Sequence, residues 1–139
     1  MTAIAEDYRP KVEASYRRCL LSGTFFDDFY QTFLASSPLV AEKFRNTAWE
    51  KQKNLLRIAL RQMVDYYFAH DEAAAQTMAD IGDSHSKAMM NITQELYDLW
   101  LESLMTTIAE HDSHYSDELG KAWREVMNHG IAAITARYE

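Results

Sequence analysis

Apolar residues recur at intervals of three and four positions along most of the chain, which is the spacing of one face of an α-helix. The broadest stripe contains Phe25, Phe26, Phe29, Tyr30 and Phe33 and is typical of a deeply buried helix. Polar breaks separate it from narrower stripes on either side. The pattern predicts seven helices, the third of them short, over residues 5–20, 24–35, 38–44, 48–69, 72–88, 94–111 and 117–138. We therefore expect an all-α fold.

Several breaks between the stripes carry side chains that cap helix N-termini. Ser37, Asp71 and Ser116 each stand directly before a predicted helix, where a side-chain oxygen can accept a hydrogen bond from a free backbone N–H. Thr47 and Glu50 have the spacing of a capping box, in which each side chain bonds the backbone of the other. These residues predict where four of the helices begin.

The composition supports the helical interpretation and limits the partners. Only four glycines and two prolines occur among 139 residues, so a β-rich fold would lack the residues of its turns. No repeat or low-complexity linker divides the chain, and we expect one domain over residues 1–139. The formal net charge of −7 argues against nucleic acids and anionic membranes as partners, because both attract basic proteins.

Targeting signals are not apparent in the sequence. No segment approaches about 18 consecutive apolar residues, the length that a membrane-spanning helix needs. Residues 1–10 contain no apolar run of the signal-peptide type. Cys19 is the only cysteine, so no internal disulfide can form, which fits a reducing compartment. The sequence therefore predicts a cytoplasmic protein without a membrane anchor.

Three segments are more specific than the periodic pattern. Residues 29–44 read FYQTFLASSPLVAEKF, residues 81–85 read IGDSH, and residues 122–127 read AWREVM, followed by Gly130 and Ile131. In this order, they resemble three parts of the bacterial single-domain globins: the second and third helices, the end of the helix with the iron-binding histidine, and the last helix. The resemblance covers nearly the whole chain. It implies a globin-like fold of about seven helices around a haem pocket.

The resemblance implies a non-covalently bound haem b whose iron is coordinated by His85. A neutral imidazole is a good ligand for haem iron, and its second ring nitrogen needs an acceptor that fixes the tautomer. No Cys-x-x-Cys-His motif occurs, which excludes covalent attachment of the c type. Ile81 and Met89, one helical turn to either side, are expected to pack against the porphyrin. The competing interpretation of His85 is a surface or structural histidine.

On the opposite side of the haem, the resemblance places Tyr30 in the pocket. The Tyr30 hydroxyl is expected to donate a hydrogen bond to a ligand that carries partial negative charge. Phe44 is expected to wedge the macrocycle in place. Both residues could instead be ordinary core aromatics.

The distal position on the long helix is open by one residue, since the sequence has no distal histidine. In one register Lys51 is distal and Leu55 lies one turn on, whereas in the other the pair is Gln52 and Leu56. The first register buries apolar residues more cleanly, because the second would turn two basic residues toward the core at a cost for unpaired charges. Hydrogen-bonding chemistry favours the second, in which an amide stands beside the Tyr30 hydroxyl.

Other residues are candidates for the rim and wall of the pocket. The residues Lys53, Arg57 and Lys87 are candidates for pairing with the haem propionates, and the first two are those that the second register turns inward. The inner edge of the haem is expected to meet Met90, Ile92, Tyr97 and Trp100. The competing interpretation of the basic residues is that they are solvated surface charges, and that of the apolar and aromatic residues is ordinary core packing.

The other histidines are weaker candidates for a metal site. The stretch His111-Asp112-Ser113-His114 contains metal-ligating residue types. Such pairs at helix ends more often cap the helix or stay solvated. We therefore expect no metal there.

Four hypotheses on function follow. The leading one is a single-domain haem globin that reversibly binds dioxygen, with carbon monoxide and nitric oxide as other ligands. The second is an enzyme, a nitric oxide dioxygenase or a peroxidase-like protein, which would need a separate reductase because the sequence holds no flavin domain. The third is a gas sensor or a non-haem globin-fold module, and the fourth is a helical bundle without a ligand. The oligomeric state is left open, a homodimer included.

Overall fold

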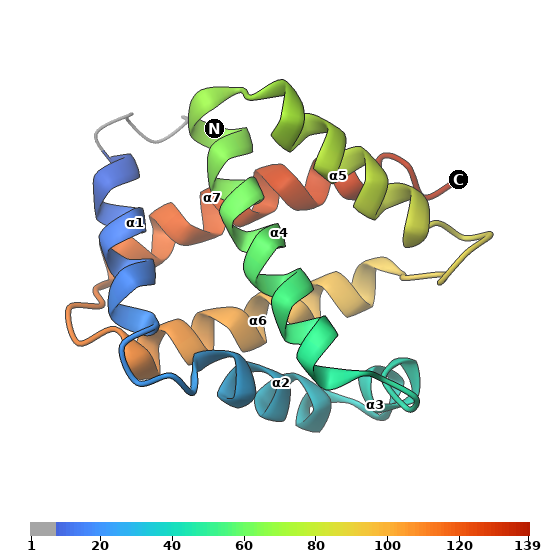
Figure 1. Cartoon of the computed structure of the whole chain (residues 1–139), viewed down its shortest axis with the longest axis horizontal. Helices are drawn as coiled ribbons and strands as arrows, with labels where there is room; N and C mark the ends of the chain where they lie inside the picture. Colours follow the sequence, from blue (N-terminus) through green and yellow to red (C-terminus); the bar gives the residue numbers. More distant parts are fainter. Residues whose placement is uncertain (1–7) are drawn as a thin grey trace.

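The computed structural model describes residues 8–139 of the chain, and that part contains helices and no strand. Figure 1 shows the helices in chain order, with the short α3 at the lower right. The prediction of seven helices is confirmed for this range. Their bounds are α1 Tyr8–Cys19, α2 Phe25–Ser36, α3 Pro38–Lys43, α4 Trp49–Ala69, α5 Glu72–Ser84, α6 Gln94–His111 and α7 Asp117–Thr135.

The predicted N-terminal caps hold at three of four helices. The side chains of Ser37, Asp71 and Ser116 accept hydrogen bonds from the first turns of α3, α5 and α7, at 3.1, 2.8 and 3.1 Å. The capping box is wrong, because Ala48 occupies the N-cap of α4 and no side chain bonds there. The first turn of α4 is therefore held less firmly than that of the other three.

Two predicted helices end earlier than expected. α5 stops at Ser84 rather than at residue 88, and α7 stops at Thr135 rather than at residue 138. After α5 the chain turns through several short backbone hydrogen bonds and passes Asn91, whose φ of 53° no helix allows. The predicted residues 5–7 of the first helix lie outside the described residues. The early end of α5 makes residues 85–93 a loop that begins at His85.

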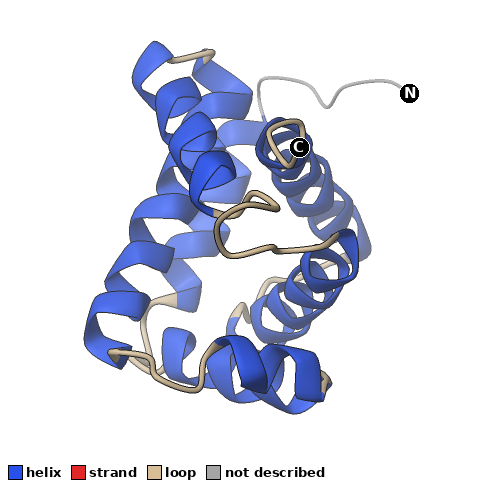
Figure 2. Cartoon of the chain, turned by 90° about the vertical axis from the view of Figure 1, so that its right-hand side faces the viewer, coloured by secondary structure: helices blue, strands red, loops and turns tan. Residues whose placement is uncertain are grey.

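The helices pack in two layers around an apolar core. In Figure 1, α4 passes in front of α6 and α7, while α2 lies along the base and packs chiefly on α6 and only sparsely on α4. The largest fully buried side chains include Trp123, Phe25 and Phe29. Figure 2 shows the loop between α5 and α6 with the C-terminus next to it. Within the described range, no helix is long and apolar enough to cross a membrane.

A buried polar network joins α1 to the corner between α6 and α7. The Asp112 carboxylate accepts a hydrogen bond from Ser15 Oγ at 2.6 Å and pairs with the Arg18 guanidinium, and Trp123 Nε1 donates to Ser15 Oγ at 3.0 Å. Burial opposes ionisation of Asp112, but the hydrogen bonds from Arg18 and Ser15 outweigh it, and the pKa of this carboxyl is lowered. Asp112 is therefore a structural residue. In the part of the chain that the structure describes, neither Asp112 nor His114 belongs to a cluster of three or more metal-ligating side chains.

Candidate functional site

His85 stands at the end of α5 with one ring nitrogen engaged. Its Nδ1 lies 2.9 Å from Ser84 Oγ, and Ser84 Oγ donates its single proton to the Ile81 carbonyl oxygen at 2.9 Å. Because that hydroxyl has no second proton to give, it accepts one from Nδ1. The proton of the neutral imidazole is thus fixed on Nδ1, and Nε2 keeps an unshared lone pair, the form that binds a metal.

The surroundings of His85 keep its ring neutral. Burial lowers the pKa of His85, and a hydrogen bond to the Ile81 carbonyl opposes this effect only in part. The ring is partly buried and stacks near Tyr97, with 6.4 Å between ring centroids and an interplanar angle of 30°. The predicted residues His85, Ile81 and Tyr97 are thus brought together.

Tyr30 is the centre of an aromatic cluster on α2, α3 and α4. It is 5% exposed, and its ring centroid lies 4.9 Å from Phe29, 5.7 Å from Phe44 and 5.2 Å from Trp49. The resemblance pointed to both Tyr30 and Phe44 as pocket residues but did not include Trp49. Burial raises the pKa of Tyr30 to about 12, so the phenol keeps its proton near neutral pH.

The Tyr30 hydroxyl is oriented by Gln52. The side-chain amide Nε2 of Gln52 donates to Tyr30 Oη at 3.0 Å. The phenol oxygen accepts in this bond, so its own proton is free to point to another acceptor. Tyr30 and Gln52 are therefore arranged as a donor pair.

The register of α4 follows from this contact. Lys51 is exposed, whereas Gln52 faces Tyr30 and Leu56 is 5% exposed. Leu55 is 48% exposed, so the expectation that it packs in the protein core is wrong. Gln52 and Leu56, rather than Lys51 and Leu55, are thus the residues of α4 that turn inward.

The charge argument against that register fails because both basic residues find partners. Lys53 Nζ lies 2.9 Å from Asp27 on α2 and 2.9 Å from Glu50, and the Arg57 guanidinium lies 5.2 Å from the Phe26 ring centroid. Neither residue is an unpaired charge turned into the core. Both face α2, which weakens their case as propionate partners.

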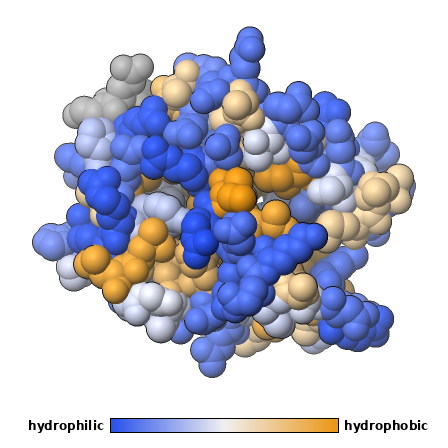
Figure 3. All heavy atoms as spheres, viewed as in Figure 1, coloured by the Kyte–Doolittle hydropathy of each residue, from blue (hydrophilic) through white to orange (hydrophobic). Residues whose placement is uncertain are grey.

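Large apolar side chains remain exposed around His85 and Gln52. Six of the eight exposed large hydrophobic residues of the described chain lie on α3, on α4 or in the loop after His85: Leu39, Trp49, Leu55, Ile58, Met89 and Met90. Figure 3 shows apolar side chains in the middle of the face that α4 crosses. Uncovered apolar surface of this kind marks a ligand or partner site. Met89 is 70% exposed, and the expected lining residues Phe44, Ile92 and Trp100 are partly buried against the core.

The loop that begins at His85 is anchored at both sides. Lys87 N donates to the Tyr138 carbonyl oxygen at 2.8 Å, the Tyr138 hydroxyl bonds the Asn91 side chain, and Lys43 Nζ donates to the Met90 carbonyl oxygen at 2.9 Å. The Lys87 side chain itself is exposed. These bonds hold the loop after α5 against the C-terminal segment and α3.

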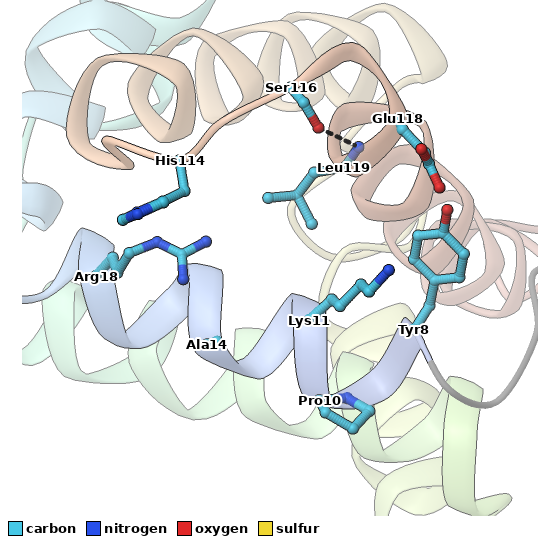
Figure 4. A pocket seen from close by; sticks show the side chains of 9 residues that line it. All are labelled: Tyr8, Pro10, Lys11, Ala14, Arg18, His114, Ser116, Glu118 and Leu119. Atoms are coloured by element: carbon cyan, nitrogen blue, oxygen red, sulfur yellow. Dashed lines mark hydrogen bonds between the residues drawn. The ribbon is translucent and has the colours of Figure 1, made fainter.

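A separate cavity of about 350 Å³ lies between α1 and the start of α7 (Figure 4). Lys11, Arg18 and His114 bring basic groups to its wall. Arg18 is already held by Asp112, and Lys11 lies over the Tyr8 ring at 5.0 Å. The cavity is remote from the loop of His85, which is at the other side of Figure 1.

Comparison with known proteins agrees with this geometry. The Globin family model matches residues 27–134, which is most of the chain. Comparison with the curated proteins gives no match. Among solved structures, the chain is similar to protein PA3967 from Pseudomonas aeruginosa PAO1, described as structurally highly homologous to a human hemoglobin. The two share 43% sequence identity over 94% of this chain and 97% of that chain, with a TM-score of 0.84. The chain therefore belongs to the globin family.

Proposed function

We propose that this globin binds haem b through His85 and reversibly binds a diatomic gas, dioxygen first, with carbon monoxide and nitric oxide as other ligands. The observation that carries the proposal is the hydrogen-bond chain from His85 Nδ1 through Ser84 Oγ to the Ile81 carbonyl. This chain leaves the lone pair of Nε2 unshared, so that Nε2 can bind a metal. When bound, haem supplies the ferrous iron that coordinates such gases.

The residues present fit a haem. A single imidazole would suffice, because a porphyrin brings nitrogen ligands of its own, whereas a metal held by side chains alone would need a cluster that residues 8–139 lack. The exposed apolar side chains Leu55, Ile58 and Met89 fit a flat apolar group between α4 and the loop after His85. Ile81, Met90, Ile92, Tyr97 and Trp100 are proposed to complete the wall.

On the distal side, Tyr30 and Gln52 supply the polar contacts. The Tyr30 O–H is proposed to donate to the gas when the gas carries partial negative charge, while Gln52 holds the phenol oxygen in place. Leu56 and Phe44 exclude water from the same space. A polar donor in a dry pocket favours dioxygen over the less polar carbon monoxide.

A second candidate function rests on the same donor pair. The polar pair Tyr30 and Gln52 also suits nitric oxide dioxygenation or peroxide chemistry, with electrons from a separate reductase in the cytoplasm. Nitrate formation from the oxygenated protein and nitric oxide, followed over repeated turnovers with a supplied reductant, separates this activity from reversible binding.

Absorption spectra of the ferric, ferrous and carbon monoxide forms test the proposal. The wild-type protein is expected to show a Soret band in all three forms. His85→Ala should lose haem or bind it far more weakly, whereas the control His114→Ala, an exposed histidine at the other end of the molecule, should keep it. A wild-type protein that takes up no haem would refute the proposal.

A further inference from the structure

A groove runs between α2 and the start of α4, on the outer side of Tyr30. Its volume is about 380 Å³, and it is lined by Asp27, Tyr30, Gln31, Leu34, Trp49 and Lys53. Because α2 and α4 touch only sparsely, the groove reaches Tyr30 without crossing a packed helix interface. The residue that carries the distal hydroxyl is thus also part of the wall of an external cavity.

Trp49 lines this groove and also belongs to the aromatic cluster around Tyr30. Its ring stacks on Phe44 at 5.7 Å and meets Tyr30 edge-on at 5.2 Å, and the residue is 36% exposed. Trp49 is the first residue of α4, which has no side-chain cap, and its indole N–H has no partner among residues 8–139. Ring contacts hold the indole, and no side-chain hydrogen bond has to break when it moves outward.

An ion pair crosses the groove beside Trp49. Lys53 Nζ on α4 lies 2.9 Å from Asp27 Oδ1 on α2 and 2.9 Å from Glu50 on its own helix. The Asp27 side chain is 58% exposed. Exposed pairs of this kind are weak and are screened by salt, so the link between the two sides opens readily.

We propose that this groove is the route by which the gas reaches Tyr30, with Trp49 as the gate and the pair of Lys53 and Asp27 as the latch. The inference rests on the proposed function. In this route the gas passes between α2 and α4. It differs from a route past Gln52, in which the gas would enter between α4 and the loop after His85.

Carbon monoxide rebinding after flash photolysis tests the route. Trp49→Ala should raise the bimolecular association rate severalfold, whereas Leu21→Ala, an exposed apolar residue in the turn between α1 and α2, should leave it unchanged. Asp27→Asn keeps the Trp49 wall and removes the latch, so it should raise the rate at low salt and abolish its dependence on ionic strength. Glu102→Gln, which breaks the exposed pair with Arg124, is the matched control.

Hydroxyl-radical footprinting with mass spectrometry gives a readout that needs no gas binding. Oxidation of Tyr30 should increase in Trp49→Ala and in Asp27→Asn, while Tyr97, next to His85, should react as in the wild type. Unchanged association rates and unchanged Tyr30 oxidation in a haem-containing Trp49→Ala protein would refute the route alone. A wild-type protein without a Soret band would instead refute the proposed function.

Discussion

Replacement of Tyr30 by phenylalanine tests the contribution of one hydroxyl group in the proposed distal pocket. Tyr30 is 5% exposed and its ring is fixed by Phe44 and Trp49, so Tyr30→Phe removes the hydroxyl and leaves the packing in place. A hydrogen bond to a charged acceptor stabilises by about 1.5–3 kcal/mol. Loss of that bond should therefore speed dioxygen dissociation by roughly ten- to a hundredfold.

The assay is stopped-flow replacement of dioxygen by carbon monoxide, with carbon monoxide dissociation measured in parallel. Carbon monoxide is less polar and should respond much less to Tyr30→Phe. Gln52→Leu serves as the comparison, because it removes the amide that donates to Tyr30 Oη but keeps the phenol proton, and its effect should be smaller. Equal changes in the two dissociation rates would refute the reasoning, since they would indicate a steric effect.

Three further predictions concern the proximal side and the core. Ser84→Ala should free the His85 ring and lower haem affinity by about 10- to 100-fold. This is measured by haem transfer to excess apomyoglobin, and Ser86→Ala, whose hydroxyl bonds only a backbone carbonyl, should change it little. Gly82→Ala should cost about 1–3 kcal/mol in urea unfolding, because its Cβ would lie 2.7 Å from a carbonyl oxygen of α7, and an unchanged midpoint would contradict the close contact. Asp112 has a lowered pKa, so its contribution to stability is present above the ordinary value of 3.8 and lost as pH falls toward the folded-state pKa. Asp112→Asn should therefore cost about 3 kcal/mol at neutral pH and flatten the acid limb of the stability curve, and a parallel limb would contradict this assignment.

Local signals in the sequence predicted the helices well. Ser37, Asp71 and Ser116 cap as expected, because a cap depends on a side chain and the backbone two or three residues away. The end of α5 was placed four residues too late, since bonds from Tyr138 and Lys43 hold the following loop. No local pattern contains those distant partners.

The arrangement of the candidate site could be predicted only in part, because it also depends on contacts between residues that are distant in the sequence. The resemblance to globins pointed to His85 and Tyr30, but periodicity alone favoured Lys51 over Gln52 on the long helix. That preference assumed that the inward basic residues would be unpaired, and Asp27 of α2 supplies the missing partner for Lys53. Trp49 was missed because its contacts with Tyr30 and Phe44 depend on how α4 meets α2 and α3.

The most direct test of the central claim is resonance Raman spectroscopy of the ferrous protein, read at the iron–histidine stretching band. The wild type should show this band, His85→Gly should lose it, and added imidazole should restore it in the variant, because the small ligand would occupy the space of the missing ring. A band that persists in His85→Gly without imidazole would contradict the assignment of His85 as the iron ligand.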